Sequence, residues 1–358
     1  MKTLALYLYL VIVPTAIAQA PGVTFVTIDV PGAGIGAAQG TSATAINMSG
    51  SIAGVYVDAG NVSHAFLRSP AGVIDTFDVE GAGTGPYEGT SAYAINKSGA
   101  IAGYYSDSSD VGHGFVRSKN GAISVFDVPD AGSGKYQGTY AFAINDRGVV
   151  TGYFVDSNGT FHGFVRSAKN VIATFDAPGT GLAEGTFAWG ISDSGAVSGF
   201  YYDANYARHG FERSSQGDII TFDAPGAGTG NGEGTYASSM NTAGAVGGSY
   251  ADTNLVFHGF VRSAKGKLTG FDVSTAGTGS GQGTFCEGIA PGGAVTGVFI
   301  DENSAVHGFV RSSKQVITTF DVPGAALGTF AGGINKAGEI VGKFEDAHEA
   351  SHGFLRLP

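Results

Sequence analysis

The chain has 358 residues, of which 60 are glycine, whereas Asp, Glu, Lys and Arg together make up only 14%. Each glycine in a helix interior costs about 1 kcal/mol relative to alanine, so this composition excludes a mostly helical protein, and 43% apolar residues exclude a disordered chain. The formal net charge of −11, without clusters of Lys or Arg, argues against nucleic acid as a partner.

Residues 1–18 have the pattern of a signal peptide. Lys2 precedes an apolar run over 4–13, and the small residues at 15–18 end in an Ala-x-Ala cleavage site. An uncleaved membrane anchor is the alternative, but the ten apolar residues of this run are too few to cross a bilayer of ~30 Å. The sequence therefore predicts an exported mature chain over 19–358, periplasmic or extracellular, that does not insert into a membrane.

Seven copies of one sequence unit, roughly 49 residues long, account for the whole mature chain. All seven copies keep the spacing of the frame G-x3-G-x3-D-x5-H-G-F-x-R without an insertion, with Ala in place of the triplet Gly in the first copy. A Gly-Thr threonine precedes each frame, and a Phe-Asp aspartate follows each of the first six histidines. Only the glycine-rich stretch between that aspartate and the next Gly-Thr threonine varies in length, which predicts strands in a fixed register and one tolerant surface loop per copy. The frame histidines are His64, His113, His162, His209, His258, His307 and His352.

Each copy is expected to form four short strands. In the third copy they cover 139–145, 149–155, 161–166 and 171–175, with a hairpin signal at Asp156-Ser-Asn-Gly159. The β-branched and aromatic residues, the repeat length and the absence of a 3.6-residue period predict an all-β protein, a seven-bladed β-propeller of four-stranded antiparallel blades. A β-solenoid is the alternative, but a solenoid usually repeats one short rung.

The two ends of the chain complement each other. The seventh copy stops after its third strand, at His352-Gly-Phe-Leu-Arg-Leu-Pro358, and the segment 23–31 matches the fourth strand of the other copies. We therefore expect the N-terminal strand to complete the last blade, close the ring and remove its open edge. This predicts one domain over 19–358.

These repeats resemble the bacterial extracellular HAF-repeat family, named for the triplet that appears here as His64-Ala65-Phe66. The resemblance covers all seven copies, although six of them carry Gly in place of Ala in the triplet. It implies an exported β-propeller-like repeat protein and no established activity.

The repeated Asp and His residues are interpreted as structural. Asp156 and His162 are expected to meet across their hairpin, and such a pair can orient a general base or bind a metal. A catalytic pair is needed once, whereas this one recurs in every copy, so a hydrogen-bonded staple explains it better. We assign the repeated arginines and the Phe-Asp aspartates in the same way, as ion pairs or turn caps. The Asp-x-Asn turns lack the later carboxylate of a calcium loop and are expected to be Asx turns.

No catalytic residue, metal site or cofactor is predicted. The only cysteine, Cys286, stands where the other copies have alanine, so we expect an inert buried thiol.

Two repeated positions are expected to converge in space and to bind a ligand. The residue before each Gly-Thr pair forms a broken ring of acceptors in six copies: Gln39, Glu88, Gln137, Glu184, Glu233 and Gln282. The position three residues after the threonine is unusually diverse, and its candidate ligand-binding members are Tyr93, Phe142, Trp189 and Glu287. The other copies have Thr44, Ser238 and Gly332 there. Packing between blades with compensating sizes is the alternative explanation for this diversity.

These residues predict a non-enzymatic, monomeric β-propeller that binds a glycan or a cell-surface partner on the face of its Gly-rich loops. Aromatic rings stack on the C–H faces of sugars, and acceptors bind their hydroxyls. The site is expected at the mouth of the channel on this face, near Glu184, Trp189, Glu233 and Glu287. The alternatives are a polysaccharide lyase or glycosidase that uses Glu184, Glu233 or Glu287, and a purely structural extracellular matrix protein.

Overall fold

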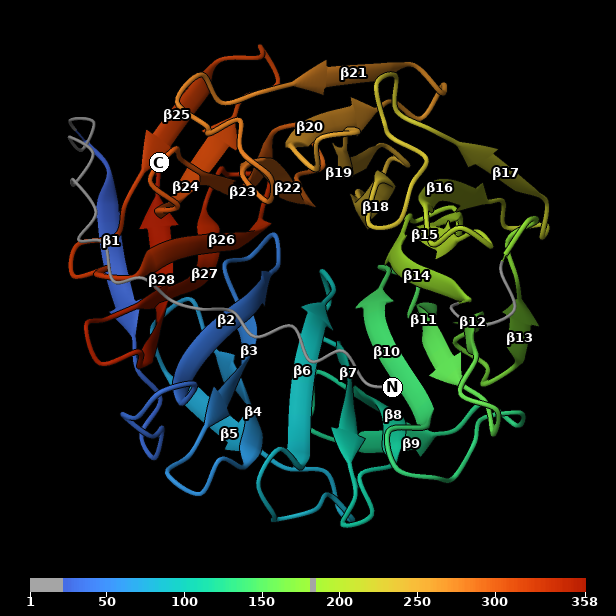
Figure 1. The fold of residues 1–358 in the computed structure, drawn as a ribbon. Helices are drawn as coiled ribbons and strands as arrows, with labels where there is room; N and C mark the ends of the chain where they lie inside the picture. The colour runs from blue at the N-terminus through green and yellow to red at the C-terminus, as the bar shows by residue number, and fades with distance from the viewer. Residues whose placement is uncertain (1–21, 181–184) are drawn as a thin grey trace.

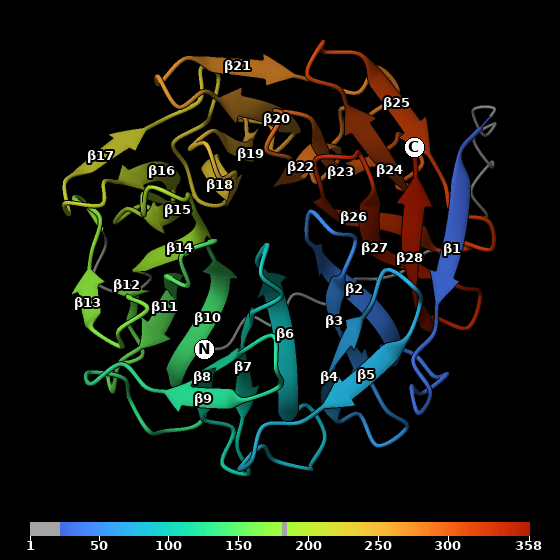
Figure 2. The ribbon, with the colours of Figure 1, turned by 180° about the vertical axis from the view of Figure 1, so that it is seen from behind.

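The computed structural model describes residues 22–180 and 185–358, and the predicted signal peptide lies outside the described residues. The described residues form 28 β-strands and no helix, so none of them belongs to a helix that could cross a membrane. The strands make one nearly closed sheet that winds around a central axis (Figures 1 and 2). The predicted all-β class is confirmed.

The strands fall into four sets according to their place in the sequence unit. The innermost strands are β2 (Gly40–Ile46), β6 (Gly89–Ile95), β10 (Gly138–Ile144), β14 (Thr186–Ile191), β18 (Gly234–Met240), β22 (Gly283–Ile289) and β26 (Gly328–Ile334). The second strands are β3 (Ile52–Val57), β7 (Ile101–Ser106), β11 (Val150–Val155), β15 (Val197–Tyr202), β19 (Val246–Ala251), β23 (Val295–Ile300) and β27 (Ile340–Glu345). The third strands are β4 (Ser63–Arg68), β8 (Gly112–Arg117), β12 (Phe161–Arg166), β16 (Arg208–Arg213), β20 (Phe257–Arg262), β24 (Val306–Arg311) and β28 (Ser351–Leu357). The outermost strands are β5 (Ile74–Phe77), β9 (Ile123–Phe126), β13 (Ile172–Phe175), β17 (Ile219–Phe222), β21 (Leu268–Phe271), β25 (Ile317–Phe320) and β1 (Thr24–Ile28).

Consecutive strands of a unit pair antiparallel, as in β2–β3, β3–β4 and β4–β5. We call β2–β5 unit 1 and number the others in chain order, so that unit 7 contains β26, β27, β28 and β1. The N-terminal strand pairs antiparallel with β28, from Thr24 opposite Leu357 to Ile28 opposite Gly353. Figure 1 shows this contact as the blue β1 beside the red β28. The predicted completion of the last unit by the N-terminal strand is confirmed.

Glycine and threonine of the Gly-Thr pair tie neighbouring units together. Gly89 has a φ of +107°, and a Cβ there would lie 2.0 Å from the carbonyl oxygen of Ser63 in the preceding unit, so no other residue fits this approach. The Thr90 hydroxyl accepts a hydrogen bond from the backbone N–H of Val79, which directly follows the Phe-Asp aspartate. All seven units make this bond, including the two with a shortened Gly-rich loop. Both ends of each loop are thereby fixed whatever its length.

The hydrophobic core lies between units. One cluster joins Ala53 and Ala65 of unit 1 to Ile101 and Phe115 of unit 2. The phenylalanine of every histidine triplet is completely buried: Phe66, Phe115, Phe164, Phe211, Phe260, Phe309 and Phe354. Each unit therefore needs its neighbour to bury its apolar face, which favours a closed ring.

The repeated arginines also connect units, but mainly by stacking. The guanidinium of Arg117 lies 4.7 Å from the ring centre of Phe77 in the preceding unit, and the arginines of units 3–7 stack on a phenylalanine in the same way. Arg117 adds an ion pair with Asp75, and Arg262 pairs with Glu212. The predicted ion pairs therefore form at only a minority of the repeated arginines. The recurring interaction is stacking on the phenylalanine that precedes a Phe-Asp aspartate.

Candidate functional site

A histidine between two aspartates recurs in every unit at the outer rim of the Gly-rich loop face. In unit 1, His64 Nδ1 lies 2.9 Å from Asp78 Oδ2, and Nε2 lies 3.6 Å from Asp58 Oδ2. The ring stacks on Tyr56, with centroids 4.8 Å apart. We call this group the rim staple. Its repetition and its full set of partners fit the predicted structural role, and the Phe-Asp aspartates are its second carboxylates.

The pKa values of the hairpin aspartates in six rim staples, and of the histidines in two, are shifted toward the charged form. The backbone N–H of Val62 holds the pKa of Asp58 below its ordinary value against the opposing desolvation, and Gly60 and His64 add to this effect. Burial alone would lower the pKa of His352, but its bonds to Asp29 and Asp346 outweigh burial and raise that pKa. Each staple is thus a local ion-pair network that links a hairpin to the following outermost strand.

The predicted ring of acceptors folds back on its own loops. Glu88 Oε2 accepts the N–H of Gly85 at 2.6 Å, and Glu233 Oε2 accepts that of Gly230 at 2.8 Å. The amide oxygens of Gln39, Gln137 and Gln282 accept the equivalent N–H groups, whereas Glu184 lies outside the described residues. These hydrogen bonds stabilise the loops, and the second carboxylate oxygens of Glu88 and Glu233 are not used in them.

Two tyrosines in the same loops point into solvent, whereas the neighbouring acceptor side chains bond their own loops. Tyr87 and Tyr136 directly precede Glu88 and Gln137, and their side chains are 80% and 62% exposed. Their backbones are left-handed, with φ of 69° and 64°, at a position that Gly232 and Gly281 fill in units 5 and 6. Hydrogen bonds from the Tyr87 N–H to Asn61 O (2.7 Å) and from the Tyr136 N–H to Asp110 O (2.8 Å) hold both backbones in place.

These two tyrosines were not predicted from the sequence, although the sequence of the equivalent loops distinguishes them. A left-handed tyrosine costs about 1–2 kcal/mol relative to a right-handed backbone. The exposed ring of Tyr87 returns little of that energy through burial, whereas the ring of Tyr136 has the Lys135 ammonium 4.7 Å from its centre. Glycine at the same position of other units, as in Gly232 and Gly281, was the available clue.

The diverse position three residues after each threonine is a β-bulge. In β2 the register shifts between Ala43 and Ala45, which leaves Thr44 outside the antiparallel ladder. The same shift occurs in all seven innermost strands. Because a bulged residue has no ladder partner, its side chain is free to point elsewhere. The bulged residues are Thr44, Tyr93, Phe142, Trp189, Ser238, Glu287 and Gly332.

Three of the seven bulged residues are aromatic, and the other four are small or polar. Phe142 packs against Tyr93 and Trp189, with ring centroids 4.9 and 4.4 Å apart. On the other side, Thr44 donates to Ala92 O (2.9 Å) and Ser238 donates to Cys286 O (2.6 Å), each in the next unit. Packing between units, the alternative explanation, therefore accounts for Tyr93, Phe142, Thr44 and Ser238.

Trp189 and Glu287 carry polar groups that form no hydrogen bond with the described part of the protein. Both line a cavity of about 240 Å³, together with Thr44, Ser238 and Gly332. The Trp189 Nε1–H is buried and has no hydrogen-bond partner among the described residues. Glu287 is accessible from the channel, yet protein surrounds it on all sides, and this desolvation raises its pKa to about 7.

The structure separates these two residues from the Gly-rich loops. Glu233 and Ser238, the bulged residue of the same innermost strand, are five positions apart along extended chain, which is about 16 Å. Glu233 and Glu287, two of the carboxylates considered for a glycosidase, therefore belong to different parts of the molecule.

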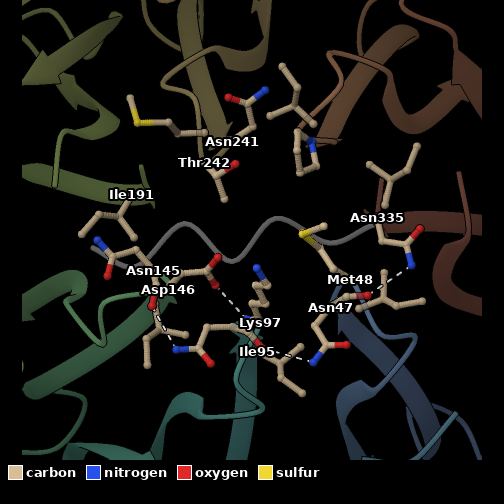
Figure 3. Close-up of a pocket in the computed structure, with 17 residues that line it drawn as sticks. Asn47, Met48, Ile95, Lys97, Asn145, Asp146, Ile191, Asn241, Thr242 and Asn335 are labelled. Atoms are coloured by element: carbon tan, nitrogen blue, oxygen red, sulfur yellow. Dashed lines mark hydrogen bonds between the residues drawn. The ribbon is translucent and has the colours of Figure 1, made fainter. Parts of the chain in front are cut away.

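Asparagine turns surround the opposite mouth of the channel. Asn47 Nδ2 donates to Asn96 O at 3.1 Å, and Asn335 Nδ2 donates to Asn47 O across the junction of units 7 and 1. Figure 3 shows these side chains around a cavity of about 170 Å³. An apolar collar separates this mouth from the Trp189–Glu287 cavity and lines both: Ile46, Ile144, Ile191, Met240, Ile289 and Ile334.

The remaining sequence predictions concern Cys286 and the Asp-x-Asn turns, and both are confirmed. Cys286 is completely buried, and this burial raises its pKa well above the ordinary value. In the third unit, Asp156 Oδ1 accepts the N–H groups of Asn158 and Thr160, each at 2.8 Å, as an Asx turn requires. No group of three His, Cys, Asp or Glu side chains in the described part of the chain is arranged to hold a metal ion.

Comparison with known proteins identifies the fold without a family. No family model matches the sequence, and no curated protein matches it. Among solved structures, the chain is similar to virginiamycin B lyase from Staphylococcus aureus with quinupristin (12% identity, TM-score 0.59, covering 94% of this chain and 100% of that one). It is also similar to a streptogramin B lyase (14%, 0.57, 93% and 97%) and to the BP39L lectin from Burkholderia pseudomallei (8%, 0.53, 87% and 94%). At these identities the likeness concerns the fold alone, and the fold is β-propeller-like.

Proposed function

We propose that this protein is an exported, non-enzymatic, monomeric seven-bladed β-propeller that binds a neutral glycan on its Gly-rich loop face. The signal-peptide pattern and the resemblance to the HAF-repeat family support export to the periplasm or the cell exterior. The antiparallel pairing inside each unit and the propeller-like structural neighbours support the four-stranded blades.

The single observation that carries the glycan proposal is the pair of exposed, left-handed tyrosines, Tyr87 and Tyr136. A fold that holds a large apolar ring in solvent, on a backbone that glycine would occupy at lower cost, points to a role outside folding. Two rings on adjacent loops offer stacking faces along the rim of neighbouring units.

The chemistry of the loops favours a sugar chain over a protein partner. A stable protein interface buries about 800 Å² on each side around an apolar core, whereas these tyrosines stand on glycine-rich polar loops. Sugar rings present apolar C–H faces between hydroxyls, and tyrosine can stack on the first and hydrogen-bond the second. The net charge of −11 disfavours a polyanionic glycan.

Retention by polysaccharides tests the proposal. The mature protein is run through native gels that contain a soluble neutral β-glucan, xyloglucan or galactomannan, and is mixed with insoluble cellulose and chitin, with alginate as the anionic comparison. We expect at least one neutral polysaccharide to retain the protein. The double variant Tyr87→Gly/Tyr136→Gly should lose this retention while its melting temperature stays level or rises slightly, since glycine relieves the left-handed backbones.

Tyr206→Gly is the matched control. Tyr206 is also exposed and left-handed (φ 61°), but it lies in the Asp hairpin of unit 4 and should leave retention unchanged. Equal retention of the double variant and the parent, or no retention of the parent on any neutral polysaccharide, would contradict the proposal.

A further inference from the structure

The face opposite the Gly-rich loops is made entirely of short turns, which follow the innermost strands and the third strands. Backbone hydrogen bonds close both kinds of turn, as from Asn47 N–H to Ser51 O and from Ser69 N–H to Val73 O. Within each kind, the interval between the flanking strands is the same in every unit that has the turn. No turn is therefore longer than its equivalents, and the surface is level. We call it the turn face.

Most cations of the chain lie on the turn face. Its turns and strand ends contain 15 Lys and Arg and six Asp and Glu, a formal net charge of +9. The acids are Asp75, Asp146, Asp193, Glu212, Asp218 and Glu339, and two of them pair with repeated arginines. Besides the seven repeated arginines, the cations are exposed turn residues: Lys97, Lys119, Arg147, Lys169, Lys265, Lys267, Lys314 and Lys336. None of these turn cations forms an ion pair with a residue that the structure describes, and the paired lysines, Lys135 and Lys343, lie elsewhere.

The Gly-rich loop face has the opposite charge. The fourteen aspartates of the rim staples lie there, together with loop carboxylates such as Glu88 and Glu233. The net charge of −11 is therefore the sum of an acidic face and a basic face. The turn cations are spread from Lys97 to Lys336 along the sequence, and only the fold gathers them on one surface.

Exposed apolar side chains lie among these cations. Val171 and Val316 are 67% and 64% exposed, and they close the serine turns that contain Lys169 and Lys314. Val73 has the same place in unit 1 and is 68% exposed. A level basic surface with apolar side chains at its turns suits an anionic bilayer, because the cations attract the lipid headgroups and the apolar side chains enter between them.

We propose that the turn face is a docking surface for an anionic phospholipid bilayer. The protein binds there peripherally, and the bilayer repels the acidic loop face, which therefore points away from the lipid. A soluble polyanion would use the lysines but gain nothing from the exposed valines. A second copy of the chain would have to place its acidic face here, and the Gly-rich loops of that face differ in length and do not match a level surface. This docking is independent of the glycan site.

Flotation with lipid vesicles tests the proposal. The mature protein is mixed with vesicles of phosphatidylcholine, with and without phosphatidylglycerol. We expect binding that requires phosphatidylglycerol and is lost at about 1 M salt, where the screening length falls to about 3 Å. The triple variant Lys169→Gln/Lys265→Gln/Lys314→Gln should bind at least about tenfold more weakly. Its fold should be intact, since Gln216 occupies the same turn position in unit 4.

Ser108→Glu/Ser157→Glu/Thr253→Glu is the matched control. It changes the net charge as much as the lysine variant does, but at an exposed hairpin position of the loop face that Glu302 occupies in unit 6. This control should bind the vesicles as the parent does. Equal losses in the two triple variants would show that net charge governs binding, and would overturn the assignment to the turn face.

Two double variants separate lipid docking from other partners. Val171→Ser/Val316→Ser should bind the vesicles about threefold more weakly, and an unchanged affinity would overturn the lipid in favour of a soluble polyanion. Tyr87→Gly/Tyr136→Gly should bind them as the parent does, so lipid docking and glycan binding can fail separately. No flotation of the parent with phosphatidylglycerol, or salt-sensitive oligomers in sedimentation without lipid, would also overturn the proposal.

Discussion

The rim staples and the bulge ring come from the same repeat, but the residues of the staples are identical in every unit and the bulged residues all differ. Every rim staple has the same histidine between two aspartates, with Nδ1 distances of 2.8–3.1 Å in all units. No two bulged residues are the same. A staple must fold the same hairpin in every unit, whereas a bulged residue has left the ladder and no longer affects strand register. Variation inside a repeat thus marks the positions that folding has released.

The largest loss of stability is expected when the ring itself is opened. Deletion of 23–31 should remove the outermost strand of unit 7 and the burial of Ile28 and Val30, which are 2% and 3% exposed. We expect a loss of at least about 4 kcal/mol of stability from these two side chains alone, with aggregation through the exposed edge of β28. Thermal unfolding and light scattering measure both effects. A chain that begins at residue 22 is the control, and a 23–31 deletion as stable and monomeric as this control would contradict ring closure by β1.

The rim-staple groups with shifted pKa values should make the stability of the protein depend on pH. The pKa values of Asp58, Asp156 and Asp346 are lowered, so their contribution is present above pH 3.8 and is lost as pH falls through the lower folded values. The pKa values of His307 and His352 are raised, so their contribution is complete below pH 6.5 and is lost as pH rises through the higher folded values. We expect the melting temperature to be highest between about pH 4 and 6.5. A melting temperature that rises steadily from pH 6 to 9 would show that the staples do not govern stability.

A single staple should matter more than a single bulge. His307 is the most buried of the rim histidines, bonds Asp321 at 2.9 Å and stacks on Phe299. His307→Ala should therefore cost about 2 kcal/mol. Thr44→Ser, which introduces a hydroxyl that unit 5 already uses as Ser238, should cost less than about 0.5 kcal/mol. Denaturant titrations compare the two, and equal losses would remove the distinction between rim and bulge.

The smallest effect on stability is expected from Glu287 in the bulge ring. Desolvation raises the pKa of Glu287 from 4.5 to about 7, so its ionisation weakens the fold increasingly as pH rises from 4.5 through 7. Its neighbours Tyr236 and Cys286 have raised pKa values and stay protonated in this range. Glu287→Gln should therefore stabilise the protein at pH 8 by about 1 kcal/mol, since channel water screens part of the charge, and should have no effect at pH 4. Calorimetry at both pH values checks this, and a stability loss at pH 8 would contradict the desolvated carboxylate.

Repetition made much of the architecture predictable. The fixed spacing from Asp156 to His162 and the match of 23–31 to the outermost strands identified the strands, their order and the partner of β1. The alanines that replace Cys286 in the other units predicted its burial. The hydrogen bonds of loop side chains were less accessible: the oxygens of Glu88 and Gln137 accept N–H groups three residues earlier, which the sequence analysis did not predict, and their role in ligand binding stays a prediction.

The repeat, its strands and the closure of the ring could be predicted from the sequence. They depend on spacing along the chain and on hydrophobic alternation, which are local properties. Which of the bulged residues face the channel depends on contacts between units and is seen only in the tertiary structure. Tyr93, Phe142, Trp189 and Glu287 occupy one repeat position, but the neighbour in the adjacent unit determines whether a side chain is packed or left free. Tyr93 and Phe142 meet other rings, whereas Trp189 keeps an unpaired N–H and Glu287 stands beside the empty position of Gly332. Such contacts arise between equivalent positions that are 45–49 residues apart in the sequence, and no local pattern records them.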